Sequence, residues 1–136
     1  MQKDLTTQKN ISIIVATFRR PVLLEQTLKS FLALDTAGLN WEVLIVDNAD
    51  DPETKKAALN YSERIPLRYF AELKRGKNNA LNRALPEAQG ELFVFTDDDV
   101  VVEKDWLVEI WNGVKRWPGN HVFGGLCPVD GLLKIV

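Results

Sequence analysis

The sequence contains only one cysteine and one histidine in 136 residues. Cys127 therefore has no second cysteine for an internal disulfide. A lone cysteine beside apolar Leu126 is usually a small buried residue, which argues against a catalytic thiol. Zinc sites in proteins are typically built from several cysteine and histidine ligands. We therefore expect any metal bound by this chain to have oxygen ligands.

Long hydrophobic runs and an excess of positive charge are also missing. The net charge is −2, and proteins that bind nucleic acid usually present a basic surface, so we expect no nucleic-acid partner. The polar segment 1–10 lacks the apolar stretch of a signal peptide. No apolar run approaches the roughly 20 residues of a membrane helix. These features indicate a cytoplasmic protein, with membrane association expected only of a longer form.

Short apolar runs alternate with segments of helical periodicity along the chain. The composition is 46% hydrophobic and 26% charged, which is typical of a globular domain and argues against disorder. This alternation favours an α/β fold, a mainly parallel sheet with helices on both faces, in one domain. The predicted strands are 11–16, 41–46, 66–70, 92–95 and one from 121. The predicted helices are 21–34, 51–62, 77–88 and 104–117.

Polar residues follow three of these strands at the point where each strand ends. They are the segments 17–19, 47–48 and 97–99. In open α/β sheets, ligands bind outside the carboxyl ends of the strands, so the fold should bring these segments together in one site. Asp47 could accept hydrogen bonds from a ribose or a base, although a turn or cap role is also common for such a residue.

Three adjacent carboxylates, Asp97, Asp98 and Asp99, follow an apolar strand. Mutual repulsion and partial desolvation make such a run unfavourable unless a cation offsets it. If the strand geometry continues, Asp97 and Asp99 point to one face and Asp98 to the other. Two such oxygen ligands suit Mg²⁺ or Mn²⁺ with waters and a diphosphate. The alternative is an acidic turn before the next helix; we favour the metal site.

The segment from Gly76 to Asn82 begins a helix with a glycine and several amides. Gly76 permits close backbone approach, and Asn78 and Asn82 share one helix face, four residues apart. This face could contact a nucleotide, although a solvated surface is the simpler interpretation of the amides alone. Basic residues that could contact phosphates, or could be ordinary surface residues, are Arg19, Arg20, Lys74, Arg75 and Lys77.

In their order and spacing, these motifs together resemble the family 2 inverting glycosyltransferases, which have the Rossmann-like nucleotide-diphospho-sugar transferase (GT-A) fold. The resemblance extends over about residues 11–125. It implies that Thr17, Phe18 and Arg19 contact the nucleoside and that Asp47 reads the base.

The same resemblance covers the third helix and the acidic run. Gly76, Ala80 and Asn82 match a glycine–alanine–asparagine pattern of the family, and 97–99 match its D-x-D segment. In the family the first aspartate of this segment approaches the ribose and the last binds the divalent metal. The resemblance implies substrate contacts from Gly76, Asn82, Asp97 and Asp98, and a metal held by Asp99 with Asp97. Lys74 departs from the pattern, because an asparagine usually stands there.

The resemblance implies transfer of a sugar, with inversion, from a nucleotide-diphosphate sugar to an acceptor hydroxyl. We expect a UDP-sugar donor, Mn²⁺ or Mg²⁺ as cofactor, and a saccharide or lipid-linked acceptor. No general base is assigned, because the acidic residues after the run have no family match as a base. We expect 1–136 to be the nucleotide-sugar-binding domain, truncated before the acceptor-binding half. Such a chain should transfer sugar poorly and self-associate, as a dimer, through the apolar segment 132–136.

Two other functions use the same residues. In a haloacid-dehalogenase-type phosphatase, Asp97 would be the nucleophile and Asp99 the acid/base, but that motif normally ends the first strand of its domain. A truncated nucleotide-binding or oligomerising module without turnover would keep the donor residues. A dinucleotide-binding fold is disfavoured, because no G-x-G-x-x-G follows the first strand.

Overall fold

Strands and helices alternate from β1 to α4, as the sequence predicts. The computed structural model describes residues 8–116, 126–129 and 132–135. Its elements are β1 (Lys9–Thr17), α1 (Pro21–Leu32), β2 (Trp41–Asp47), α2 (Pro52–Leu59), β3 (Leu67–Ala71), α3 (Lys77–Ala84), the 3₁₀ turn η1 (Leu85–Glu87), β4 (Gly90–Thr96), α4 (Trp106–Arg116), β5 (Leu126–Val129) and β6 (Leu132–Ile135). The strand predicted at 121–123 lies outside the described residues.

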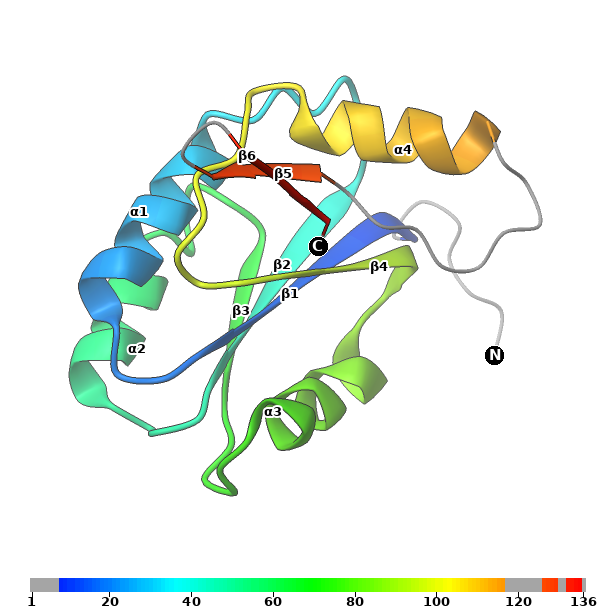
Figure 1. Cartoon of the computed structure of the whole chain (residues 1–136). Coiled ribbons are helices and arrows are strands. Elements are labelled where there is room, and N and C mark those ends of the chain that lie inside the picture. Colours follow the sequence, from blue (N-terminus) through cyan, green and yellow to red (C-terminus); the bar gives the residue numbers. More distant parts are fainter. Residues whose placement is uncertain (1–7, 117–125, 130–131, 136) are drawn as a thin grey trace, which may run out of the picture.

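The first four strands form one sheet in the order β3-β2-β1-β4, in which every neighbouring pair is parallel (Figure 1). The predicted α/β fold is therefore confirmed. In the tail, where the sequence shows no clear element, β5 and β6 form a separate antiparallel pair. Among the described residues, no helix is both long and apolar enough to cross a membrane.

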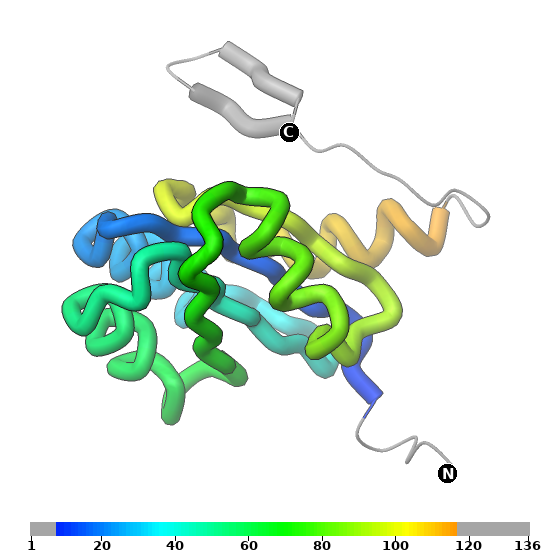
Figure 2. Tube along the Cα trace, turned by 90° about the horizontal axis from the view of Figure 1, so that it is seen from below, coloured from blue at the N-terminus to red at the C-terminus, as the bar shows by residue number. Residues whose placement is uncertain are grey.

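Helices cover both faces of the sheet because β1 and β2 are apolar on both sides. One face, with Ile13, Val15 and Ile45, packs against α1, α2 and α4. The other face, with Ile14 and Leu44, packs against α3, which lies in front of the strands in Figure 2. Strands buried on both faces are typical of a parallel sheet.

Two prolines set the bounds of helices. Pro21 occupies the first turn of α1, where a missing backbone N–H costs nothing. Pro86 falls inside the helix predicted to reach residue 88, and α3 instead ends at Ala84 and continues as η1. The reason is that proline lacks the donor for the helical hydrogen bond and clashes with the preceding turn.

The strand β4 forms one edge of the described sheet and is less buried than its neighbours. Phe93 and Phe95 are 38% and 46% exposed. Their register partners in β1 are Ser12 and Ile14, so both rings lie on the α3 face. The strand β4 therefore leads into the acidic run, while its Phe93 and Phe95 side chains stay partly exposed.

Glu42 anchors the amino-terminal end of the sheet. Its carboxylate is buried and accepts hydrogen bonds from the Ser12 hydroxyl (2.6 Å), the Gln89 backbone N–H (2.7 Å) and the Arg68 guanidinium (2.8 Å). The Gly90 N–H in turn donates to the Ser12 hydroxyl (2.8 Å). One carboxylate thereby ties all four parallel strands together, at the end opposite to the acidic run.

Candidate functional site

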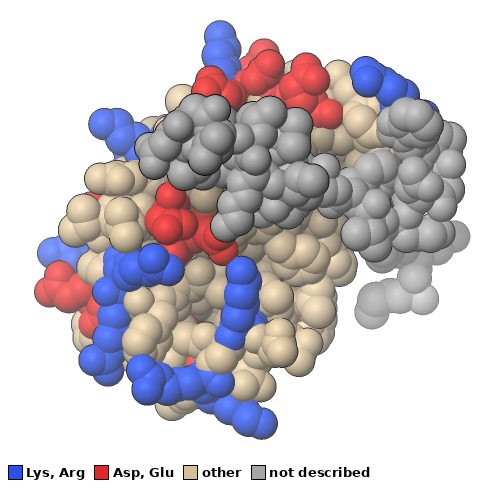
Figure 3. Space-filling model, viewed as in Figure 1, with Lys and Arg blue, Asp and Glu red and all other residues tan. Residues whose placement is uncertain are grey.

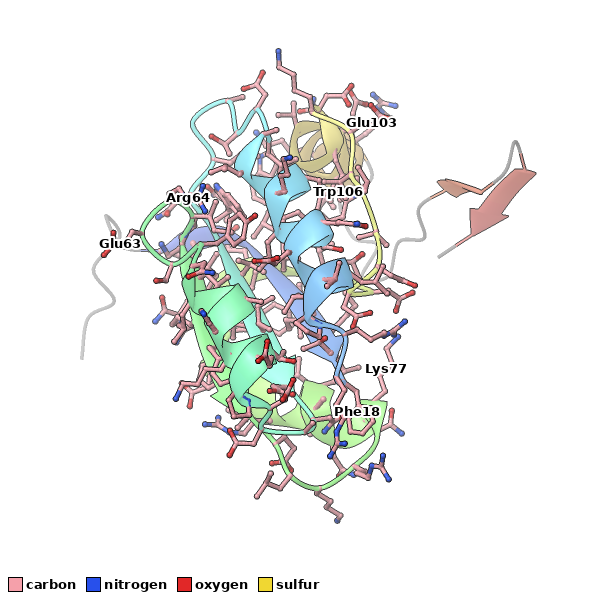
Figure 4. The ribbon with its side chains drawn as sticks, turned by 90° about the vertical axis from the view of Figure 1, so that its left-hand side faces the viewer. Phe18, Glu63, Arg64, Lys77, Glu103 and Trp106 are labelled. Atoms are coloured by element: carbon pink, nitrogen blue, oxygen red, sulfur yellow. The ribbon has the colours of Figure 1, made fainter. Side chains whose placement is uncertain are left out.

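A cleft of about 370 Å³ lies at the carboxyl ends of β1, β2 and β4. Residues from all three polar strand ends meet there as predicted, although Arg19, Asp47 and Asp99 are not among the residues that line the cleft. Figure 4 shows Phe18 and Lys77 together at this end of the molecule. The cleft is lined by Ala16, Thr17, Phe18, Arg20, Asn48, Arg75, Gly76, Lys77, Asp97 and Asp98.

The acidic run forms a turn and does not continue the strand. β4 ends at Thr96, and Asp98 and Asp99 lie in a turn. The alternation assumed from strand geometry therefore does not apply. Asp97 and Asp99 are nevertheless 56% and 44% exposed, whereas Asp98 is 1% exposed, because other contacts turn the Asp98 side chain inward.

Those contacts come from the end of β1 and the start of α1. The Thr17 hydroxyl donates to Asp98 Oδ2 at 2.7 Å, and Arg20 Nη2 lies 2.9 Å from Asp98 Oδ1. Asp98 Oδ1 is buried and has no partner with hydrogen-bonding geometry. The predicted substrate contacts Thr17 and Asp98 thus bind each other, and Arg20 compensates the charge of the buried Asp98 carboxylate.

Basic side chains neutralise the two exposed carboxylates. Lys77 Nζ lies 3.1 Å from Asp97 Oδ1, and Arg20 Nη1 lies 3.6 Å from Asp99 Oδ2. Figure 3 shows acidic atoms with Lys and Arg side chains beside them. The sequence marked Lys77 and Arg20 only as possible phosphate contacts. The Lys77–Asp97 pair is exposed, so a cation or an anion can replace one partner of this pair at little cost in stability. Arg20 also pairs with the buried Asp98 carboxylate and is held more firmly.

Asp47 is fully buried, and its carboxylate holds the turn after β2. It accepts hydrogen bonds from the backbone N–H groups of Ala49 (2.9 Å) and Asp51 (2.8 Å) and from the Tyr69 hydroxyl (2.6 Å). Burial and this hydrogen bond raise the pKa of Tyr69, so Tyr69 stays protonated and donates. The turn role that the sequence left open is therefore present, and base recognition by Asp47 stays a prediction.

The loop between β3 and α3 forms another wall of the cleft. Asn48 Nδ2 donates to the backbone carbonyls of Glu72 (2.9 Å) and Lys74 (3.2 Å), which ties this loop to the end of β2. Gly76 has a φ of 122°, which L side chains rarely adopt, so glycine is required where α3 begins. Exposed Asn82, further along α3, is not among the described residues that line the cleft.

Phe18, Asn48 and Arg75 line both this cleft and a neighbouring hollow of about 470 Å³. The Arg75 guanidinium lies 4.6 Å and that of Arg19 5.5 Å from the centre of the Phe18 ring. Arg19, a predicted nucleoside contact, has a φ of 52° and lines the hollow with Phe18 and Leu73. The three predicted contacts at 17–19 thus diverge, because Thr17 is buried while Phe18 and Arg19 reach the surface.

The general base stays unassigned. Glu103, one of the acidic residues after the run, lies toward the opposite end of the molecule from Phe18 and Lys77 (Figure 4). The described ranges also contain no cluster of three or more histidine, cysteine or carboxylate side chains that could hold a metal.

Thr27, which is fully buried in α1, was not predicted from the sequence. Its hydroxyl contacts the backbone on both sides of Asp99. The sequence does show one sign of this role, because Thr27 is a hydroxyl residue on the apolar face of a helix, between Leu24 and Phe31.

The self-association expected at 132–136 depends on side chains outside the described part.

This chain is similar in sequence and in fold to known glycosyltransferases. The model of the family "Glycosyl transferase family 2" matches residues 12–126. The GalNAc(5)-diNAcBac-PP-undecaprenol beta-1,3-glucosyltransferase of Campylobacter jejuni is 36% identical over 92 residues, which are 65% of this chain and 29% of that protein.

Two solved structures have a similar fold. The mannosyltransferase PcManGT of Pyrobaculum calidifontis, in complex with GDP-Man and Mn²⁺, has a TM-score of 0.70 and 31% identity, covering 86% of this chain and 34% of its own. TarS 1-349 of S. aureus, in complex with UDP, has a TM-score of 0.72 and 24% identity, covering 79% and 32%. The TarS likeness shows the fold alone. The present chain spans about a third of the length of these proteins.

Proposed function

Because this chain belongs to glycosyl transferase family 2, we propose that its cleft binds a nucleotide-diphosphate sugar, with UDP as the expected nucleotide. The observation that carries the proposal is the meeting of Thr17, Asn48 and Asp97 from three strand ends in one cleft. This position is where open α/β sheets bind their ligands. The GDP-Man held by PcManGT, at 31% identity, supports a donor of this class.

We propose Mn²⁺ or Mg²⁺ as the cofactor, and the donor set fits such a cation. Mg²⁺ is usually bound through one or two carboxylates together with waters and substrate phosphates. Asp97 lines the cleft and Asp99 follows two residues later, and both offer half-exposed carboxylate oxygens. The buried Asp98 carboxylate pairs with Arg20 and holds this basic side chain beside the exposed aspartates. A bound cation would offset the charge that develops on the departing diphosphate.

The remaining roles follow from the basic and aromatic side chains. Lys77 and Arg20 lie beside the exposed aspartates, within reach of the diphosphate that a cation there would bring. Phe18 and Arg75 offer stacking surfaces for the nucleoside. The sugar would pass, with inversion, to a hydroxyl of a saccharide or lipid-linked acceptor. The undecaprenol-linked substrate named for the Campylobacter relative supports the second class.

Calorimetric titration of the chain with UDP tests the proposal directly. We expect the affinity for UDP to be at least about tenfold higher with Mn²⁺ than with a chelator, because the cation bridges carboxylates and diphosphate. GDP, titrated in parallel, reports which base is preferred. Equal affinity for either nucleotide with and without metal would contradict the proposed site.

Lys77→Met should affect metal and nucleotide in opposite directions. Without Lys77, Asp97 loses a competing cation, so Mn²⁺ alone should bind more tightly. Affinity for UDP with saturating Mn²⁺ should fall about tenfold, because one charge-assisted contact to phosphate is lost. Electron paramagnetic resonance of free Mn²⁺ measures the first quantity and calorimetry the second. Lys115→Met, the same change at an exposed lysine of α4, is the control and should change neither. Equal changes in both lysine variants would show that Lys77 does not contact the metal ligands or the phosphates.

A further inference from the structure

The turn that carries the exposed aspartates is held by a hydroxyl of α1. Thr27 Oγ1 donates to the Asp98 backbone carbonyl at 2.8 Å and accepts from the Val100 N–H at 3.0 Å. A threonine hydroxyl has one donor and can accept as well, so both capacities serve this one turn. The two contacts bracket Asp99, one on each side, and fix its backbone.

A second hydroxyl continues this support one turn further along α1. Ser30 Oγ accepts from the Val102 N–H at 3.2 Å and donates to the Thr27 carbonyl within the helix at 2.6 Å. Serine and threonine inside helices commonly bond only to a carbonyl of the preceding turn. The Thr27 hydroxyl instead forms long-range hydrogen bonds, to residues more than 70 positions away in sequence.

These contacts hold the Asp98 side chain and the backbone of the turn, but not the carboxylates of Asp97 and Asp99. The Asp98 side chain is held by Thr17, and the backbone around Asp99 is held by Thr27, which is fully buried. The Asp97 and Asp99 carboxylates are not buried and contact only exposed basic side chains. The backbone of the turn therefore limits where these two carboxylates can lie, and Thr27 supplies the two hydrogen bonds that flank Asp99.

We propose that Thr27 is a positioning residue of the donor site, which sets the geometry of Asp97 and Asp99 and thereby the metal dependence of nucleotide binding. This inference rests on the proposed function. Thr27 touches neither metal nor nucleotide and acts through the turn. Partners that orient metal ligands typically change metal affinity by about 10–100-fold when they are removed.

Thr27→Val, which keeps the shape and removes the hydroxyl, tests the proposal. Thr54→Val is the matched control, because Thr54 is also fully buried in a helix but bonds to Asp51 at the start of α2. Thr27→Ser keeps the hydroxyl and should behave as the unmodified chain. In the ligand-free chain, hydrogen exchange of the Val100 amide should accelerate in Thr27→Val alone.

The second measurement is the ratio of the UDP affinity with Mn²⁺ to that with a chelator. We expect this ratio to fall about tenfold in Thr27→Val and to be retained in Thr27→Ser and Thr54→Val. A general loss of stability would lower both affinities and leave the ratio unchanged. If Thr27→Val does not fold, Ser30→Ala tests the same support, with faster exchange at Val102 and a smaller fall in the ratio.

The outcomes separate the two proposals. Unchanged exchange at Val100 in Thr27→Val, or faster exchange with an unchanged ratio, overturns the role of Thr27 and leaves the donor site standing. A ratio of one in the unmodified chain overturns the proposed function, and the role of Thr27 with it.

Discussion

Asp99→Asn should remove most of the metal dependence of nucleotide binding. We expect the affinity for UDP in Mn²⁺ to fall about 100-fold, because the loss of a ligand costs at least as much as the loss of a residue that orients one. Asparagine keeps the shape of the side chain but not the charge that offsets the cation. Asp99 is 44% exposed and pairs only loosely with Arg20, at 3.6 Å, so the stability of the fold should change little.

Calorimetry with Mn²⁺ and with a chelator measures this effect. The control is Asp105→Asn, which makes the same substitution at an exposed aspartate just before α4. This control should retain the full metal dependence. If Asp99→Asn bound UDP with the same metal dependence as the control, Asp99 would not be a metal ligand.

Glu42→Ala should destabilise the fold far more than substitution of the exposed aspartates. The free energy of unfolding should fall by about 3 kcal/mol, because breaking a buried ion pair leaves the remaining partners unsatisfied. The Ser12 hydroxyl, the Gln89 N–H and the Arg68 guanidinium would lose their common acceptor. Glu42 is only 2% exposed, so water cannot readily replace the carboxylate.

Urea denaturation followed by circular dichroism measures this loss. Glu87→Ala is the matched control, because Glu87 is a half-exposed carboxylate that lies 3.8 Å from the same Arg68. Its removal should change the stability by less than about 1 kcal/mol. Equal losses in the two variants would show that burial of Glu42 does not determine its contribution. UDP affinity of folded Glu42→Ala should match the unmodified chain, because Glu42 lies at the other end of the sheet.

The alternation of strands and helices, and the meeting of polar strand ends, followed from the sequence. Both depend on short-range periodicity and on a general property of parallel sheets. Apolar residues on both sides of β1 and β2 required helices on both faces. For this reason the sequence alone predicts a site at the edge of the sheet where the cleft lies.

The individual roles within the site could not be predicted in the same way. Whether Asp98 points inward depends on Thr17 and Arg20, which are about 80 residues away in sequence. Whether Asp47 is free depends on Tyr69 of β3. In the sequence, Thr27 is only a polar residue on an apolar helix face. Its role is not visible there, because its partners are backbone groups of a distant turn. Hydrogen bonds between distant segments leave no periodic pattern in the sequence.

The strand order β3-β2-β1-β4 also has a consequence for synthesis on the ribosome. β1 is made first and occupies an inner position, between β2 and β4. β2 and β3 can pair on one side of β1 as soon as they emerge, but the other side must wait for Gly90–Thr96. Throughout this interval a growing chain presents the unpaired edge of a largely apolar strand, the kind of surface that pairs with the wrong partner. The arrival of β4 therefore both completes the sheet of the nascent chain and delivers the three aspartates, so that the acidic turn forms only once the rest of its support exists.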